Sequence, residues 1–161
     1  MNQRWYGVGV LLAVLAMLTV SAPATAAANQ VPFKGRSSGV VTTVGVDLEA
    51  MIVHTHVQGE GQATHLGHFT VSGDVDLDLV TGLPEGTWTL TAANGDMLFL
   101  AMDGHGGDEP LQGFGAFTVV GGTGRFEGAS GYYEQIITFG ADPGTSPSTP
   151  YTDVLEGTIS F

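Results

Sequence analysis

Apolar and polar residues alternate with a period of two along most of this chain. The clearest example is FTVSGDVDLDL, residues 69–79, where Phe69, Val71 and Val75 share one face and the aspartates occupy the other. Successive side chains of a β-strand point to opposite sides. The pattern therefore predicts a strand with one buried face and one face in water.

Similar segments recur, separated by Gly, Pro, Asn and Asp. Residues 87–102, TWTLTAANGDMLFLAM, are typical of a hairpin, and Asn94-Gly95 predicts a type I′ turn because both central residues of that turn need positive φ. No helical stripe follows residue 31. Further strands are predicted at 33–44, 50–58, 113–120, 131–139 and 152–161.

About eight strands joined in order by short connections favour an all-β antiparallel meander that closes into a barrel. Closure removes exposed sheet edges, and an eight-stranded barrel is either filled by side chains or holds one small ligand. A two-sheet β-sandwich is the alternative. The length suits one domain, residues 29–161. The predicted inward set is Phe69, Val71, Leu77, Trp88, Leu90, Phe117, Tyr133, Ile137 and Ile159.

One predicted strand, residues 97–102, is apolar on both faces. In a lone barrel one of these faces would meet water. Two interpretations follow: another segment of the chain covers the strand, or the strand forms an interface in a homo-oligomer.

The N-terminal residues 1–28 predict a secretory signal peptide. Arg4 precedes an apolar run over residues 8–20, and small residues fit A-x-A cleavage between Ala26 and Ala28. The run is too short for a membrane-spanning helix. We therefore expect a secreted, extracellular or periplasmic protein with no stable membrane insertion after cleavage.

The charge balance and the absence of cysteine exclude several function classes. Sixteen acidic residues outnumber four basic ones, so nucleic acid is not an expected partner and an anionic membrane surface is disfavoured. Without cysteine there can be no disulfides, thiolate metal sites or cysteine nucleophiles. No cofactor is predicted.

The stretch VVGGTGRFEGASGYY, residues 119–133, is rich in glycine but is not a phosphate-binding loop. No Lys follows the glycines and no helix is predicted after them. Glycines tolerate positive φ, so a sharp corner between two strands is the simpler explanation. Phe126 would then plug one barrel end, and Arg125 would either brace the loop or contact a ligand.

This motif, GGTGRF at residues 121–126, resembles that of dirigent proteins and of allene oxide cyclase-like proteins. THLGHFTVSG (64–73) and TLTAANGDMLF (89–99) are similar to segments of small secreted bacterial members of that group. The resemblance implies an eight-stranded antiparallel barrel, calycin-like or allene oxide cyclase-like, that binds hydrophobic small molecules and tends to oligomerise. Plant members include oxylipin cyclases and proteins that steer phenoxy-radical coupling. Only scaffold residues match, so the catalytic residues are unknown.

Three functions stay open: a barrel that binds an apolar small molecule, which we favour, a non-catalytic interaction module that oligomerises, and a cyclase- or dirigent-like enzyme. The ligand-binding candidates are Trp88, Phe117, Arg125, Tyr133 and Gln135. No metal site is predicted, although a hairpin could bring imidazoles together around zinc or copper. The residues concerned would be His54, His56 and His65.

Overall fold

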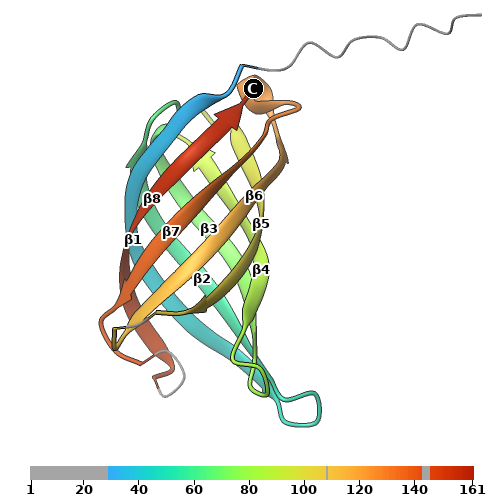
Figure 1. The fold of residues 1–161 in the computed structure, drawn as a ribbon, viewed down its shortest axis with the longest axis vertical. Helices are drawn as coiled ribbons and strands as arrows, with labels where there is room; N and C mark the ends of the chain where they lie inside the picture. Colours follow the sequence, from blue (N-terminus) through green and yellow to red (C-terminus); the bar gives the residue numbers. More distant parts are fainter. Residues whose placement is uncertain (1–28, 108, 143–145) are drawn as a thin grey trace, which may run out of the picture.

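A computed structural model describes residues 29–107, 109–142 and 146–161, which form one closed β-barrel (Figure 1). A short 3₁₀ turn, η1 (Gly124–Phe126), is the helical element of these residues. The strands are β1 (Val31–Asp47), β2 (Ile52–Ala63), β3 (Gly67–Asp78), β4 (Pro84–Ala92), β5 (Met97–Gly106), β6 (Gln112–Gly122), β7 (Ser130–Phe139) and β8 (Ser148–Ser160).

Every strand pairs antiparallel with the next, and β8 returns to pair with β1. The predicted all-β, eight-stranded antiparallel barrel is confirmed, and the sandwich alternative is not what forms. The register shifts between Thr43 and Gly45 in β1 and between Phe99 and Leu100 in β5, as expected of bulges that help a sheet to curve.

The alternation along the strands sorts residues between the interior and water. Of the predicted inward set, Leu77 is half-buried and all the others are buried. Asp74 and Asp76 are exposed, as is Glu134 on β7. The inward-facing side chains are therefore mainly apolar, and the outer wall carries polar side chains together with exposed apolar ones such as Val120 and Val154.

The predicted hairpin between β4 and β5 is present, but the predicted type I′ turn is wrong. Gly95 has φ +88°, whereas Asn94 keeps a negative φ. The Gly95 amide donates to the Ala92 carbonyl at 2.8 Å, and the Ala92 amide donates to the Asp96 carbonyl at 2.9 Å. A type I turn followed by a left-handed glycine explains this geometry, because it needs only one residue with positive φ.

The glycine-rich stretch forms the corner that was predicted, and it closes one barrel end. Gly124 has φ +58° at the start of η1, where an L side chain is disfavoured. The turn places Phe126 inside the barrel, fully buried, with its ring edge-on to Phe161 at 5.2 Å. Leu66, from the turn between β2 and β3, is buried in the same core.

The predicted signal peptide, residues 1–28, lies outside the described residues. On β5, the outer face of the 97–102 segment is partly open to water, with Met97 37% and Phe99 36% exposed. No helix within the described ranges is long and apolar enough to cross a membrane.

Candidate functional site

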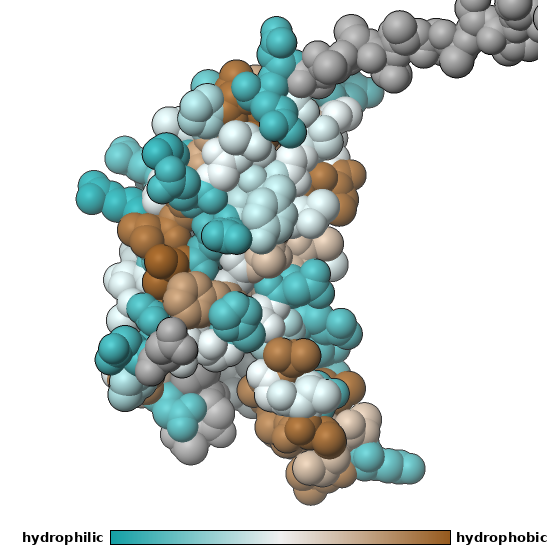
Figure 2. Space-filling model, viewed as in Figure 1, coloured by the Kyte–Doolittle hydropathy of each residue, from teal (hydrophilic) through white to brown (hydrophobic). Residues whose placement is uncertain are grey.

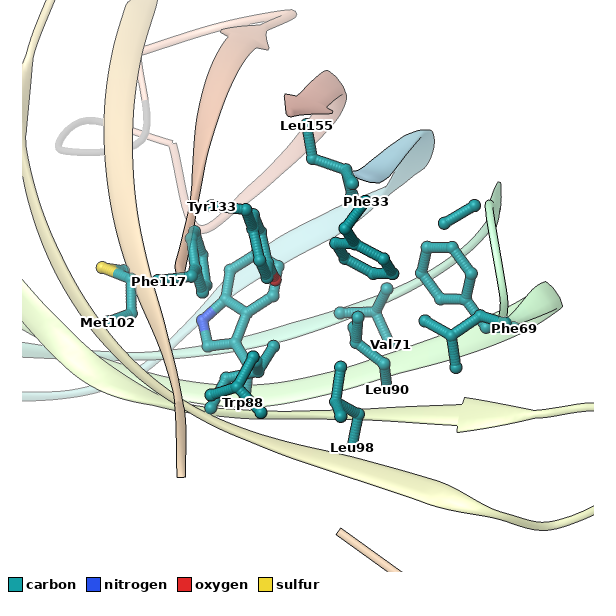
Figure 3. Close-up of a cluster of buried hydrophobic side chains, with 14 of the residues drawn as sticks. Phe33, Phe69, Val71, Trp88, Leu90, Leu98, Met102, Phe117, Tyr133 and Leu155 are labelled. Atoms are coloured by element: carbon teal, nitrogen blue, oxygen red, sulfur yellow. The ribbon is translucent and has the colours of Figure 1, made fainter. Parts of the chain in front are cut away.

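A row of aromatic rings crosses the barrel interior (Figure 3). Phe33 lies 5.2 Å from Tyr133, and Tyr133 stacks on Phe117 at 4.9 Å with an angle of 3° between the rings. Phe117 then meets Trp88 edge-on at 5.0 Å. The rings come from β1, β4, β6 and β7, so the row ties opposite walls of the barrel together.

Inward-facing glycines make room for these rings. A Cβ atom on Gly73 would lie 2.6 Å from Cδ1 of Trp88, and one on Gly115 would lie 2.6 Å from Cε2 of Phe117. Both distances are far shorter than a carbon–carbon contact. The rings can therefore lie against the sheet only because these two positions lack a side chain.

The barrel interior is solid toward η1 and hollow toward the other end. A cavity of about 470 Å³ lies there, and Trp88 and Tyr151 are among its inner walls. It reaches the loops that follow β3, β5 and β7, which lie at the lower end of the barrel in Figure 1. The apolar side chains in its lining are Val41, Val53, Val57, Val75, Leu77, Pro84, Trp88, Met102, Pro110, Leu111, Phe114, Ile137 and Phe139.

A second hollow, on the outer face of β1, β2, β7 and β8, has a different character. Its rim is formed mainly by exposed side chains, including Arg36, Glu60 and Gln62. Solvent reaches these groups directly. The interior cavity is the better candidate for a site because it combines burial with an apolar lining.

Two polar groups in the cavity lining have no hydrogen-bond partner among the described residues. They are the indole Nε1 of Trp88 and the hydroxyl of Tyr151, and both are buried. Burial raises the pKa of Tyr151, and the nearby Ser37 hydroxyl lowers it in part. The two hydroxyls nevertheless do not form a hydrogen bond. Because leaving a buried polar group unpaired is costly, a ligand or water that reached them would be stabilised.

A buried carboxyl group, Asp153, lies two residues from Tyr151 on the inner face of β8. The Ser37 amide donates to Oδ1 of Asp153 at 2.8 Å, and the Ser37 hydroxyl donates to Oδ2 at 2.5 Å. The Gln135 amide Nε2 also donates to Oδ2. Ser37 is the direct partner of Asp153 across the β1–β8 ladder, so strand register brings this pair together.

Burial dominates the electrostatics of this cluster. It raises the pKa of Asp153, and the hydrogen bonds from Ser37 and Gln135 only partly oppose that shift. Burial, reinforced by the Asp153 charge, raises the pKa of Tyr151 to about 12, and it raises the pKa of Tyr133 strongly as well. Both tyrosines are therefore protonated hydrogen-bond donors at neutral pH.

The Asp153 cluster combines one titratable group with several hydrogen-bond donors and acceptors. A buried carboxyl with a raised pKa is the type of group that takes part in proton transfer. Here, however, Oδ1 of Asp153 accepts from Ser37 and Oδ2 accepts from Ser37 and Gln135, and Asp153 is not among the residues that line the cavity. The Gln135 carbonyl Oε1 has no partner in the described structure and is a further acceptor.

The structure brings most of the predicted ligand-binding residues together inside the barrel. Trp88 lines the cavity, Phe117 and Tyr133 belong to the aromatic row, and Gln135 belongs to the Asp153 cluster. Arg125 lies apart from them, at the closed end.

The contacts of Arg125 tie the η1 loop to neighbouring loops. Its guanidinium donates to the Leu66 carbonyl at 3.3 Å and lies 4.8 Å from the centre of the Phe126 ring. Its Nε lies 3.6 Å from the Asp96 carboxylate. These are the contacts of a brace between the turns of the closed end.

The histidines considered for a metal site do not meet. Nδ1 of His54 lies 2.6 Å from Asp76, and Nδ1 of His56 lies 2.6 Å from Asp74, both on the outer wall. His65 lies in a turn, with φ +66° and its ring 5.5 Å from Phe161. Within the described ranges, no three His, Cys, Asp or Glu side chains are grouped as metal ligands.

Ser37, Tyr151 and Asp153 were not predicted as site residues from the sequence. One signal could have found them. In the segment YTDVLEGTI, Tyr151 and Asp153 share strand parity with Leu155 and Ile159, so an aspartate stands on the predicted buried face. An acidic residue at an inward position is unusual enough to indicate a polar cluster.

Comparisons with known proteins add a fold but no family. No family model matches the sequence, and no curated protein matches it. Among solved structures, the chain is similar to the pterocarpan synthase dirigent protein GePTS1, with a TM-score of 0.59 and 13% sequence identity. The match covers 83% of this chain and 86% of that one. It shows a dirigent-like closed barrel, in agreement with the resemblance of the GGTGRF motif.

Proposed function

We propose that this protein is exported and binds one apolar small molecule in the open half of its barrel. The observation that carries the proposal is the 470 Å³ cavity, which has apolar walls and two unpaired polar groups. Small-molecule sites are commonly cavities of about 300 to 1,000 Å³ with a few well-placed polar groups.

The lining also indicates which chemistry a ligand should have. Apolar walls favour a hydrocarbon or aromatic body, since each buried methylene contributes about 0.8 kcal/mol. The Trp88 indole is a donor only, and the Tyr151 hydroxyl stays protonated at neutral pH. The ligand that fits best therefore carries an oxygen that accepts hydrogen bonds, such as a carbonyl, ether or hydroxyl.

Export is supported by the N-terminal pattern of residues 1–28, with its charged start, apolar run and A-x-A sites. The chain has no cysteine, so it needs no disulfide chemistry after export. We propose an extracellular or periplasmic location for a mature protein that begins near Ala27 to Asn29.

Binding is favoured over catalysis by the state of Asp153. An enzyme that uses acid–base chemistry needs an acid or base within reach of its substrate. Asp153 is not among the residues that line the cavity, and both of its oxygens accept hydrogen bonds from the protein itself. The competing proposal of a non-catalytic interaction module needs a surface rather than a cavity. A cavity that holds only water in the protein from its own host would favour that alternative.

Native mass spectrometry of the protein purified from its own host tests both parts of the proposal. We expect a bound small molecule that leaves on collisional activation, and an intact mass that starts between Ala27 and Asn29. A mass that includes residues 1–28 would contradict export, and a protein that carries no ligand would weigh against binding.

A fluorescence titration with N-phenyl-1-naphthylamine, an uncharged apolar probe, tests the cavity directly. Val75→Phe projects a ring into the cavity. It should lower probe affinity by about tenfold, because the new ring occupies space in which the aromatic rings of the probe would be buried. Val120→Phe is the matched control, since Val120 is 63% exposed on the outer wall. Equal affinities for both variants, with native circular dichroism, would place the probe elsewhere.

A further inference from the structure

Two turns at the open end of the barrel carry large apolar side chains in water. The first joins β1 to β2 and exposes Leu48 (76%) and Met51 (40%); the second joins β3 to β4 and exposes Leu79 (42%), Val80 (77%) and Leu83 (53%). We call these side chains the apolar tip. Figure 2 shows apolar atoms gathered on the part of the molecule that extends from its lower end. Contiguous exposed apolar surface of this kind marks an interaction site.

The apolar tip is held in place by hydrogen bonds. Oδ1 of Asp47 accepts from the amides of Glu49 and Ala50, both at 2.9 Å. Asp78 does the same in the second turn, accepting from Val80 and Thr81 at 2.7 and 3.0 Å. The two turns thus have closely similar internal bracing.

A further hydrogen bond joins the two turns, from the Leu79 amide to the Met51 carbonyl at 2.8 Å. The exposed side chains are therefore presented by a pre-ordered pair of turns. Little conformational entropy is lost when such a surface docks.

The apolar tip adjoins the mouth of the cavity. Leu77 and Gly82, at the two sides of the second turn, belong to the cavity lining, as does Val53 just after the first turn. The apolar surface therefore continues from the tip into the barrel. A ligand of low solubility could cross from a partner at the tip to the cavity without entering bulk water.

We propose that the apolar tip docks reversibly into an uncharged or zwitterionic lipid surface, with the cavity mouth facing the lipid. Binding of this type scales with the apolar area that enters the headgroup region. It differs from stable insertion, because only turn side chains enter the lipid.

The distribution of charge disfavours an anionic lipid surface. The charged residues of the two turns are carboxylates, Asp47, Glu49 and Asp78, and no Lys or Arg occurs between Arg36 and Arg125. Arg125 itself lies at the closed end. An anionic surface would repel this end of the molecule.

The shape of the tip argues for lipid over a second copy of the chain. The two turns extend outward from the barrel end (Figure 1). A stable interface needs about 800 Å² on each partner and close shape complementarity. Two protruding tips cannot enclose each other, whereas lipid headgroups rearrange around a protrusion.

Vesicle flotation of the full mature protein tests the proposal. We expect the protein to float with phosphatidylcholine vesicles, with binding little changed by salt and weaker when phosphatidylserine is added. Leu48→Ser combined with Val80→Ser should lower the bound fraction by about tenfold, because both side chains would otherwise leave water. The matched control is Val120→Ser combined with Val154→Ser, which alters outer-wall valines that are 63% and 56% exposed.

Several outcomes would overturn the inference. The first is a wild-type protein that does not float. The second is a control variant that loses as much vesicle binding as the variant with Leu48→Ser and Val80→Ser. The third is a self-associated wild-type protein that only the Leu48→Ser and Val80→Ser changes dissociate. The last would assign the tip to a second copy. Probe binding in solution separates this inference from the proposed function. The Leu48→Ser and Val80→Ser variant should bind N-phenyl-1-naphthylamine with wild-type affinity. A wild-type protein that floats with vesicles but does not bind the probe would contradict only the proposed ligand binding in the cavity.

Discussion

Asp153 is an acidic residue that strand alternation places on the inner face of the sheet. It is 5% exposed inside a barrel whose other inner residues are mostly apolar. Hydrogen bonds from Ser37 and Gln135 compensate its charge in part, yet its pKa is still raised by burial. An apolar residue there, with apolar residues in place of its partners, would avoid this cost. The polar cluster therefore gives the interior a feature that packing alone does not require.

The raised pKa predicts how stability depends on pH. The folded state holds the Asp153 proton more tightly than the unfolded chain, whose Asp pKa is about 3.9. The associated stability is fully present below that value and is lost as pH rises through the folded pKa. We expect the free energy of unfolding of the wild type, relative to Asp153→Asn, to fall as the pH rises from about 4 through the folded-state pKa of Asp153.

Urea unfolding at several pH values measures this difference. Glu127→Gln, at an exposed position after η1, is the control for loss of one carboxylate. A wild-type advantage that grows with pH would contradict the prediction, because it would mean that the folded state stabilises the charged form of Asp153.

At the scale of elements, the loop between β6 and β7 closes one end of the barrel. Hydrogen bonds within the loop, such as Phe126 amide to Thr123 carbonyl at 3.0 Å, turn the chain back over the barrel end. The Met97 amide donates to the Thr123 hydroxyl at 3.0 Å, which ties the loop to β5. The loop therefore seals one end and leaves the other as the entrance.

Phe126→Ala should lower the free energy of unfolding by about 3 to 5 kcal/mol, because it leaves a cavity in a fully buried site. Val120→Ala, near the end of β6 and exposed, should change it by less than about 0.5 kcal/mol. Chemical unfolding followed by circular dichroism would compare the two variants. Similar losses would show that η1 does not seal the core.

At the scale of the whole molecule, closure leaves no free sheet edge, so copies of the chain must associate through faces, loops or ends. The outer face of β5 is one candidate, since Met97 and Phe99 are each more than a third exposed. This exposure supports the proposal that the 97–102 segment forms a subunit interface.

Sedimentation velocity tests that proposal. We expect an oligomer that Phe99→Glu dissociates, because a carboxylate would have to be buried without a partner. The Leu48→Ser and Val80→Ser pair should leave the oligomer intact, which distinguishes the wall from the apolar tip. A monomeric wild type at micromolar concentration would remove the interface from consideration.

The sequence by itself determined the strands, the inward set and the corner at residues 121–131, because strand periodicity and glycine conformation are local properties. The wrong prediction of a type I′ turn at Asn94-Gly95 has the same local origin. Two turn types are compatible with this dipeptide, and the pairing at the strand ends determines which one forms. Only the tertiary structure decided that Ser37, Gln135 and Asp153 meet, that the cavity lies at one end, and that Arg125 lies at the other. These placements depend on which strands lie side by side and in which register. Closure of the whole barrel sets both, and no single segment encodes it.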